Sequence, residues 1–352
     1  MKRSNLMVGL LSVLVVFAVA AAFKAAHTVV IPLMIAWLLS YICGPVVNWL
    51  VHKRVPLGLS VLFVLMLVLF VCYLGGVFLG GRVRDVLAKS PEYIQQLNII
   101  YQDVVSGLDL PADFLADINW TQQLGPKVAA ASVTVASFMG NFLGKLTLVL
   151  IFLVFMLLGK PYFKYKIAAA FPEEQASQFT GITGGISKQI GQYLVVKVAI
   201  SGTTGVLVWL ALSVLRVEFA LTWGALAFFL NFIPSIGSIL ASIPPILLAV
   251  VQYYPNAWTP ILTAVVLLLI QMTMGNVIEP KIMGDNLNLS PVVILVSLIF
   301  FGWMWGMTGA LLSVPIAAAI KIVCENIKAL KPISILMGSG KSLWKETLEA
   351  EE

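Results

Sequence analysis

Apolar runs of membrane-crossing length recur along most of this 352-residue chain, and they restrict its fold more than any motif does. A transmembrane helix needs about 20 predominantly apolar residues, and the runs 6–23, 29–51, 57–81 and 141–158 come close to or exceed that length. Sixty per cent of all residues are hydrophobic and 11 % are charged, whereas a soluble domain is about half apolar and a quarter charged. The sequence therefore predicts an all-α, polytopic membrane protein.

The positions of polar and basic residues divide the chain into four regions. We expect N-terminal membrane segments at 1–81, a polar helical extracytoplasmic insert at 82–140, a membrane core at 141–323, and a cytoplasmic tail at 324–352. Run 6–23 also resembles a signal peptide, but we favour an uncleaved first span. Lysine and arginine gather in short loops, which places those loops and both termini in the cytoplasm by the positive-inside rule.

Two predicted helices lie outside the membrane core. In the insert, Ser90-Pro91 is typical of a helix cap followed by the first helical position, and residues 108–120 are expected to form a turn region. In the core, Pro172-Glu173-Glu174 begins a stripe of apolar residues at helical spacing. We interpret residues 172–197 as a cytoplasmic amphipathic helix, followed by a separate span from residue 198.

Two core segments carry residues that interrupt helices. Segment 231–245 contains Pro234, Gly237, Pro244 and Pro245 between apolar runs. Proline removes a backbone donor, and broken backbone at membrane depth is tolerated only inside protein or beside a watery cavity. The segment is either a transport site or gate, or a plain turn between short helices. In segment 291–323, glycines 302, 306 and 309 separate two apolar runs and indicate a hairpin.

A few polar residues near the membrane interior are functional candidates. Glu279 is the strongest, because it lies between Asn276 and Lys281 in a charged inner loop; it either carries a proton or cation, or forms a structural link to Lys281 or the backbone. Neutral amides suit a polyhydroxylated solute, although they also hold helices together. Lys197 is expected to snorkel to the interface. The full candidate set for the path is Asn231, Pro234, Gly237, Pro244, Pro245, Gln271, Asn276, Glu279, Pro280, Lys281 and Gly284, with Lys197, Glu218 and Pro315 as further candidates.

Several function classes find no support in the sequence. Cys43, Cys72 and Cys324 lie in apolar runs without metal-ligand spacing, so we expect no metal and no cofactor. The Gly340-Lys341-Ser342 tripeptide lacks the earlier glycine of a P-loop, since Ile335 stands there. No serine–histidine–acid set is visible, and the net charge of +6 is explained by the basic loops rather than by nucleic acid. The chain is therefore not expected to be an enzyme, and any transport is secondary or passive.

Several stretches resemble one known family. They are Phe-Ala-Leu-Thr-Trp-Gly at 219–224, Asn-Phe-Ile-Pro-Ser-Ile-Gly-Ser at 231–238, Gly-Asn-Val-Ile-Glu-Pro-Lys-Ile-Met-Gly at 275–284, Ser-Leu-Ile-Phe-Phe-Gly-Trp at 297–303 and Leu-Leu-Ser-Val-Pro at 311–315. The sequence thereby resembles the autoinducer-2 exporter family of bacterial inner-membrane proteins. The resemblance implies about eight membrane segments, some re-entrant, and a homo-oligomer. Other family members have been proposed to be sodium or lithium/proton antiporters.

Three functional hypotheses follow. The first is a secondary exporter of a small polar solute, autoinducer-2, with Asn231 and Asn276 binding the solute and Glu279 coupling protons. The second is a monovalent cation/proton antiporter that uses Glu279 or Glu218. The third is a membrane scaffold without transport.

Overall fold

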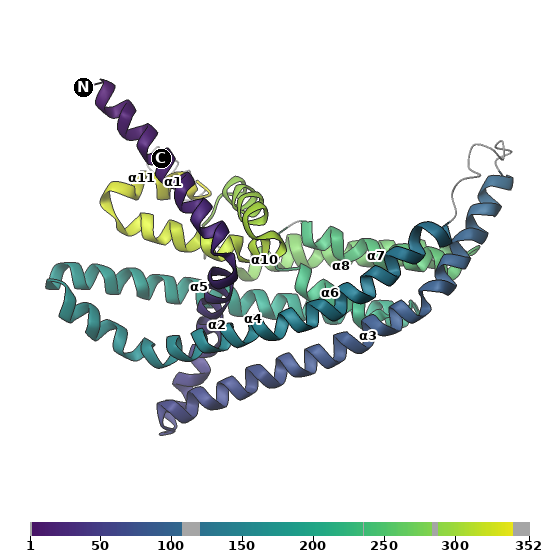
Figure 1. The fold of residues 1–352 in the computed structure, drawn as a ribbon, viewed down its shortest axis with the longest axis horizontal. Helices are drawn as coiled ribbons and strands as arrows, with labels where there is room; N and C mark the ends of the chain where they lie inside the picture. The colour runs from purple at the N-terminus through teal and green to yellow at the C-terminus, as the bar shows by residue number, and fades with distance from the viewer. Residues whose placement is uncertain (1, 108–119, 235, 284–287, 341–352) are drawn as a thin grey trace, which may run out of the picture. The chain divides into compact units, whose positions relative to one another are not determined.

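The computed structural model describes residues 2–107, 120–234, 236–283 and 288–340, and these are helical almost throughout (Figure 1). Within them, an isolated bridge between Leu289 and Gly338 is the one strand-like pairing. The helices in chain order are α1 (Lys2–Ala25), α2 (His27–His52), α3 (Leu57–Gly107), α4 (Trp120–Ala170), α5 (Glu173–Val214), α6 (Ala220–Leu230), α7 (Ile236–Tyr253), α8 (Trp258–Met272), the π-helix η2 (Thr273–Ile278), α9 (Glu279–Met283), α10 (Pro291–Asn326), the 3-10 helix η3 (Lys328–Leu330) and α11 (Lys331–Met337).

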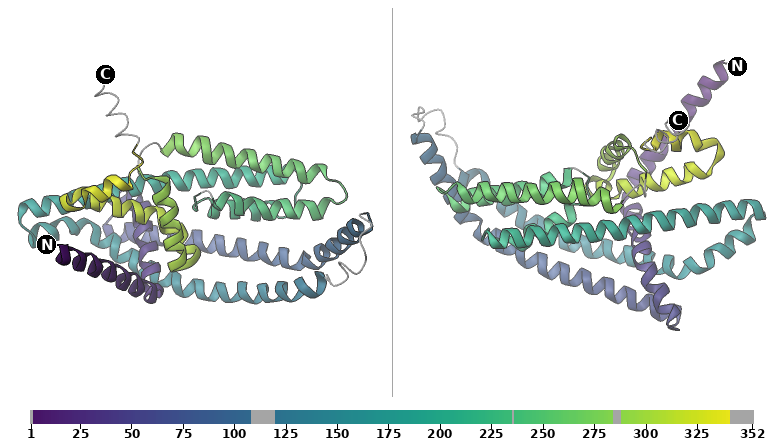
Figure 2. Two further views of the ribbon diagram at one scale, coloured as in Figure 1. Left: turned by 90° about the horizontal axis from the view of Figure 1, so that it is seen from above. Right: turned by 180° about the vertical axis from the view of Figure 1, so that it is seen from behind.

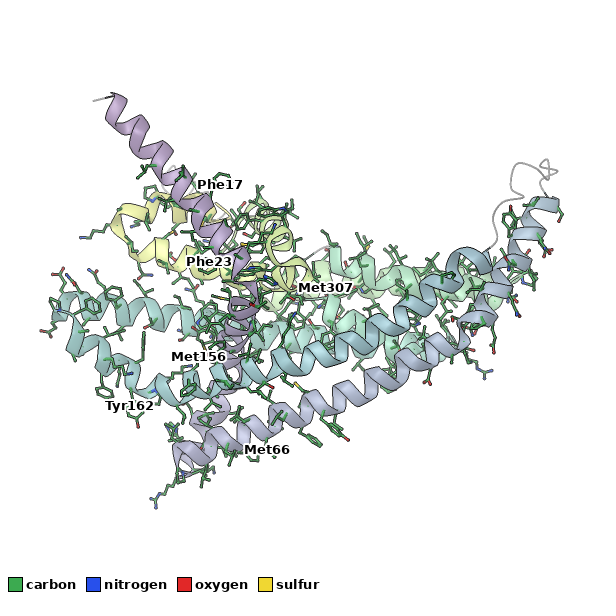
Figure 3. All side chains as sticks on the ribbon, viewed as in Figure 1. Phe17, Phe23, Met66, Met156, Tyr162 and Met307 are labelled. Atoms are coloured by element: carbon green, nitrogen blue, oxygen red, sulfur yellow. The ribbon has the colours of Figure 1, made fainter. Side chains whose placement is uncertain are left out.

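Seven helical stretches in the described residues are long and apolar enough to cross a membrane. They are His27–His52, Leu57–Gly76, Gly144–Ala170, Glu173–Val214, Ile236–Tyr253, Trp258–Ile282 and Pro291–Asn326. Many large apolar side chains on these helices project away from the protein, among them Met66, Tyr162 and Met307 (Figure 3). Lipid is the medium in which such surfaces are stable. The predicted polytopic α-helical membrane fold is therefore confirmed; the run 6–23 forms most of α1, which is not among the seven.

The chain forms two compact units. Unit 1 comprises Met1–Leu65, Gly144–Val195 and Asp285–Glu352, and unit 2 comprises Met66–Leu143 and Val196–Gly284. In unit 2, α7 and α8 lie side by side, joined by the short turn after Tyr253 (Figures 1 and 2).

Glycines let α5 and α6 approach closely in unit 2. A Cβ atom added at Gly224 would lie 2.6 Å from the carbonyl oxygen of Gly205 and 2.8 Å from the Cβ atom of Trp209. Small residues at a helix–helix contact allow backbones to approach to this degree. Unit 2 therefore places one face of α5 directly against α6.

The helices are longer than the sequence analysis predicted. Helix α3 continues through Pro91, which was wrongly expected to start a helix. A proline inside a helix costs about 3 kcal/mol, but Lys89 and Tyr93, on either side of Pro91, both bind Glu218 and hold the helix in place. The expected turn at 108–120 lies almost entirely outside the described residues.

Helix α5 joins two elements that were predicted to be separate. The amphipathic helix 172–197 and the span from residue 198 form one helix of 42 residues, which begins at Glu173 as the acidic first turn indicated. Its buried positions continue in phase through Ile190, Leu194 and Lys197 to Ser201, so packing favours an uninterrupted helix.

The two proline- and glycine-rich segments have different structures. In 231–245 the helix is broken only around Pro234, and Pro244 and Pro245 lie inside α7, contrary to our prediction. Proline's φ fits a helix, and prolines within membrane helices are tolerated when neighbouring groups satisfy the freed carbonyls.

Helix α10 doubles back on itself. Its backbone leaves helical geometry at Trp305 and Gly306, where Gly306 has φ of 64°. A Cβ atom at Gly309 would collide with the carbonyl oxygen of Phe301, although eight residues of continuous helix would separate them by about 12 Å. The predicted hairpin in 291–323 is thus present.

Candidate functional site

An ion pair between Lys197 of α5 and Glu279 at the start of α9 forms the centre of the candidate site. The Lys197 Nζ atom lies 2.5 Å from the Glu279 Oε1 atom. The Lys197 side chain is 3 % exposed and the Glu279 side chain is 22 % exposed. A charge removed from water is tolerated when it is paired and hydrogen-bonded, so Glu279 makes the burial of Lys197 possible. The expectation that Lys197 snorkels to the interface was wrong for this reason.

A π-helix positions Glu279. The backbone N–H of Glu279 donates to the carbonyl oxygen of Met274, five residues earlier, and this bond closes η2. The Met274 side chain is buried, so its packing fixes the position of this π-helical turn. π-Helical turns are rare and are often found at functional sites. We had expected a charged loop at 276–285; the described part of it is helical instead.

A polar stripe on α5 positions Lys197. Ser201 and Thr204 follow Lys197 at helical spacing, and all three are buried. Ser201 accepts a hydrogen bond of 3.0 Å from the Asn231 Nδ2 atom, at the end of α6. One face of α5 therefore contacts the end of α6 through Ser201 and the start of α9 through Lys197.

The remaining predicted residues occupy different surroundings. Pro234 lies in the turn between α6 and α7. Gly237 follows it, and a Cβ atom there would collide with the carbonyl oxygen of Leu230, so the tight turn requires glycine. Pro244 and Pro245 lie within α7, and Gln271 lies half-buried near the end of α8.

The segment after Gln271 is more open. Asn276, Pro280 and Lys281 are exposed, and Glu279 pairs with Lys197, so the alternative link to Lys281 is not formed. Gly284 lies outside the described residues. Pro315 is buried in α10, which belongs to unit 1. Of the larger predicted set, the structure therefore brings together Lys197 and Glu279, and it joins Asn231 to Ser201, which was not predicted.

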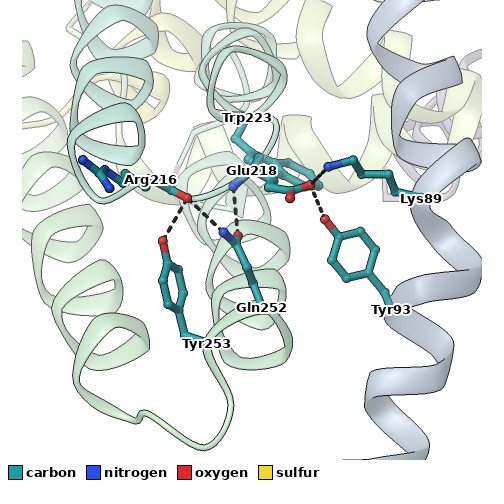
Figure 4. A network of polar contacts seen from close by, with 7 residues as sticks. All are labelled: Lys89, Tyr93, Arg216, Glu218, Trp223, Gln252 and Tyr253. Atoms are coloured by element: carbon teal, nitrogen blue, oxygen red, sulfur yellow. Dashed lines mark hydrogen bonds and ion pairs between the residues drawn. The ribbon is translucent and has the colours of Figure 1, made fainter.

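Glu218 has a different role, at the turn between α5 and α6 (Figure 4). Its Oε2 atom accepts hydrogen bonds from Lys89 Nζ at 2.8 Å and from Tyr93 Oη at 2.5 Å, both on α3. Its backbone N–H donates to Gln252 of α7, and its carbonyl oxygen accepts from Trp223 of α6. We call this set of residues the Glu218 clasp, because it joins α3, α6 and α7 to the turn that follows α5.

The same clasp stabilises an unusual backbone. Arg216 and Phe219 both have positive φ, at 56° and 58°, a conformation that costs energy for residues other than glycine. The carbonyl oxygen of Arg216 accepts hydrogen bonds from Gln252 Nε2 and Tyr253 Oη, both at 2.9 Å (Figure 4). A strained backbone persists where several contacts hold it in one conformation, as these hydrogen bonds do here.

The clasp shifts the pKa values of its members. Burial alone would raise the pKa of the Glu218 carboxyl, but the hydrogen bonds from Lys89 and Tyr93 and the charge of Lys89 outweigh it and lower that pKa. Burial and the hydrogen bond to Glu218 raise the pKa of Tyr93, and the hydrogen bond to Glu218 raises the pKa of Lys89. Glu218 is therefore held as a carboxylate by structural contacts, which is a poor arrangement for a residue that must take up and release protons near neutral pH.

Sequence reasoning missed Ser201, Thr204 and the residues that bind Glu218. Ser201 and Thr204 could have been found, because they extend the face of α5 that carries Lys197. Lys89 is the sole base among the acids of residues 85–126, and its position four residues before Tyr93 places both on one helix face. Their shared partner, Glu218, is over 120 residues away, and no local pattern indicates it.

No group of three or more possible metal ligands exists among the described residues. The three cysteines are free, with Cys43 and Cys324 buried.

The fold and the buried pair define a polytopic α-helical membrane protein with an ionised site among its helices. The family model for AI-2E family transporters matches residues 11–329. The chain therefore belongs to the AI-2E transporter family, as its motifs had indicated.

Curated relatives agree with this assignment over nearly their whole length. The chain is 34 % identical over 324 residues to the AI-2 transport protein TqsA of Escherichia coli, covering 89 % of this chain and 90 % of TqsA. It is 33 % identical over 331 residues to a provisionally named transport protein of Borreliella burgdorferi, covering 94 % and 90 % of the two chains. A protein of Haemophilus influenzae with the same provisional name is 33 % identical over 348 residues, covering 95 % and 97 %.

Proposed function

We propose that this protein is a secondary exporter of a small polar solute, autoinducer-2, and that the Lys197–Glu279 pair couples export to protons. The observation that carries the proposal is the pair itself, which keeps a lysine 3 % exposed within a candidate membrane span. Ionisable residues among membrane helices are costly and are typical of substrate or ion pathways. The likeness to TqsA supports autoinducer-2 as the solute.

The unequal exposure of the two partners supports a working cycle. Glu279 is 22 % exposed, so a proton can reach its carboxylate while Lys197 stays covered. Protonation of Glu279 removes the negative charge and weakens the ion pair. The Lys197 ammonium group then needs new acceptors, which the oxygens of a polyhydroxylated solute supply. Loss of the proton from Glu279 restores the pair and releases the solute.

The surroundings of the pair support movement at this point. A π-helix carries Glu279, and the turn at Pro234 and Gly237 follows Asn231, whose amide holds Ser201 on the Lys197 face of α5. Interrupted helices in membrane transporters are typical of binding sites. We infer that Asn231 positions α5 and that its amide exchanges Ser201 for the solute during the cycle.

Orientation and assembly form part of the same proposal. We place the protein in the bacterial inner membrane with both termini in the cytoplasm, because basic residues gather in the loops on that side. We also propose a homo-oligomer. Asn276 is exposed on η2 within a candidate span, and a polar amide at that depth needs a hydrogen-bonding partner.

The test is autoinducer-2 flux in proteoliposomes that contain the purified protein, with and without an imposed pH gradient. The proposal predicts flux above that of empty liposomes, accelerated by the gradient. Flux that follows only the solute's own gradient contradicts proton coupling. If the folded protein produces no flux, that result contradicts the assignment of autoinducer-2 as the transported solute.

The second candidate is a monovalent cation/proton antiporter. The partial exposure of the Glu279 carboxylate favours it, since a small cation needs an accessible carboxylate. In the same vesicles, sodium- or lithium-driven proton movement without autoinducer-2 flux would identify this activity.

A further inference from the structure

A second feature, in unit 1, is a cavity lined by α2, α4 and α5 that the transport proposal does not use. Its volume is about 870 Å³, which lies within the range of about 300–1,000 Å³ for small-molecule sites. Three lysines of α4, namely Lys160, Lys164 and Lys166, line it, and no aspartate or glutamate does. We call it the lysine cavity.

Within the described part of the chain, the three lysines have no acidic partner. Among the described residues, neither the ion pairs nor the hydrogen bonds include a carboxylate bound to any of them. Two of the ammonium groups lie near aromatic rings instead, with Lys160 Nζ 5.2 Å from the ring centroid of Tyr41 and Lys164 Nζ 5.0 Å from that of Tyr165. Lys160 and Lys164 are four residues apart and repel one another on the same helix face. An anion in the cavity would remove that repulsion.

Three hydroxyl groups of the cavity already donate to backbone carbonyl oxygens. Ser40 donates to the carbonyl oxygen of Trp37 at 2.6 Å, and Thr180 donates to that of Ala176 at 2.7 Å. Thr183 likewise donates to the carbonyl oxygen of its own helix. The lysines supply the positively charged donors of the cavity, so its preferred ligand is an anion with several acceptor oxygens.

The cavity's depth and its apolar wall indicate where that anion comes from. Lys160 lies 16 residues after Gly144, the start of a candidate span, which places it about 24 Å along the helix and near the edge of a hydrocarbon layer about 30 Å thick. Phe155 also lines the cavity and is 71 % exposed. It lies about 7 Å deeper than Lys160, where acyl chains would cover it.

We propose that the lysine cavity binds the phosphate group of an anionic membrane phospholipid, with the lysines on the phosphate and Phe155 along an acyl chain. Basic pockets between membrane helices bind anionic headgroups in this manner. A free phosphate-bearing solute presents the same group to the lysines but offers nothing to cover Phe155. The proposal is independent of the transported solute.

The test uses the full-length protein and native mass spectrometry after purification from vesicles of phosphatidylcholine and phosphatidylglycerol. The variant Lys160→Gln/Lys164→Gln/Lys166→Gln removes three charges from the cavity. The control Lys53→Gln/Lys328→Gln/Lys331→Gln removes three exposed charges elsewhere in unit 1. A lysine near an anionic lipid surface contributes about a fivefold factor in affinity. We expect phosphatidylglycerol binding about a hundredfold weaker in the cavity variant and nearly unchanged in the control.

Further arms keep the test decisive. Lys164→Gln alone is expected to weaken binding about fivefold. Because this single change is at an exposed position, it keeps the test informative if the triple variant does not fold. Inorganic phosphate and glycerol 3-phosphate, added at millimolar concentration, are expected not to displace the lipid. Displacement by either one overturns the assignment to lipid in favour of a soluble anion. If phosphatidylglycerol binding weakens equally in the cavity and control variants, or in neither, the lysine cavity is not the binding site.

Discussion

Removing Glu279 should destabilise the protein more than removing Lys197, because the partner left behind differs in exposure. Glu279→Ala leaves Lys197, with a 3 % exposed side chain, without its counter-charge. Breaking a buried ion pair in this way costs about 3–5 kcal/mol.

Removing Lys197 instead leaves the carboxylate of Glu279 unpaired, but that carboxylate is partly exposed to solvent. In Lys197→Met the remaining Glu279 side chain is 22 % exposed, so we expect a smaller loss, about 1–3 kcal/mol. The double variant Lys197→Met/Glu279→Gln removes both charges and should recover most of the stability, because replacing a whole buried pair by neutral groups is often close to neutral.

The assay is unfolding of the purified protein in mixed micelles with increasing denaturing detergent, followed by circular dichroism. The wild type, Lys197→Met, Glu279→Ala and Lys197→Met/Glu279→Ala form a double-mutant cycle. Lys197→Met/Glu279→Gln is measured in the same assay. A coupling energy near zero, or Lys197→Met more damaging than Glu279→Ala, would refute the reasoning from burial.

Three further predictions concern packing and pH. Gly224→Ala should destabilise unit 2 by about 1–3 kcal/mol, because the new methyl group would lie 2.6 Å from the Gly205 carbonyl oxygen, whereas Gly202→Ala has open space and should be neutral or stabilising in the same unfolding assay. Gly309→Ala should likewise destabilise the α10 hairpin, while Gly302→Ala, whose Cβ atom would lie 3.9 Å from the Ala310 Cβ atom, should not; equal effects would contradict the hairpin. The pKa of Glu218 is lowered in the fold, so the stability it contributes is complete above its ordinary value of 4.5 and is lost as pH falls through the lower folded value. Thermal unfolding between pH 6 and acidic pH should therefore show a stability loss that is smaller in Glu218→Gln, and parallel curves would contradict the clasp.

The fold class was predictable from the sequence because hydrophobic runs with few charges permit few alternatives in a membrane protein. The turn between α5 and α6, the acidic start of α5 at Glu173 and the hairpin at Gly306 also follow from local signals. Helix ends were less predictable. Proline is locally unfavourable in a helix, yet Pro91, Pro244 and Pro245 all lie within helices. At Pro91, the contacts of the neighbouring Lys89 and Tyr93 with the distant Glu218 override that preference.

The candidate site was predictable only in part. Glu279 could be identified from its polar character near the membrane interior, but its partner is 82 positions away. Lys197 alone matches a snorkelling residue, and only tertiary structure distinguishes an ammonium group that reaches the interface from one that is buried against a carboxylate. Glu218 illustrates the reverse case: it has the same local appearance as Glu279, yet its contacts with Lys89 and Tyr93 assign it to structure.

The most direct test of proton coupling at Glu279 compares pH-gradient-driven autoinducer-2 flux in proteoliposomes of the wild-type protein, Glu279→Gln and Glu218→Gln. Both variants remove one carboxylate, and both must first be shown to be folded and equally reconstituted. We predict that Glu279→Gln loses the acceleration by the pH gradient and that Glu218→Gln keeps it. Unchanged gradient-driven flux in Glu279→Gln would contradict the proposed role of the Lys197–Glu279 pair.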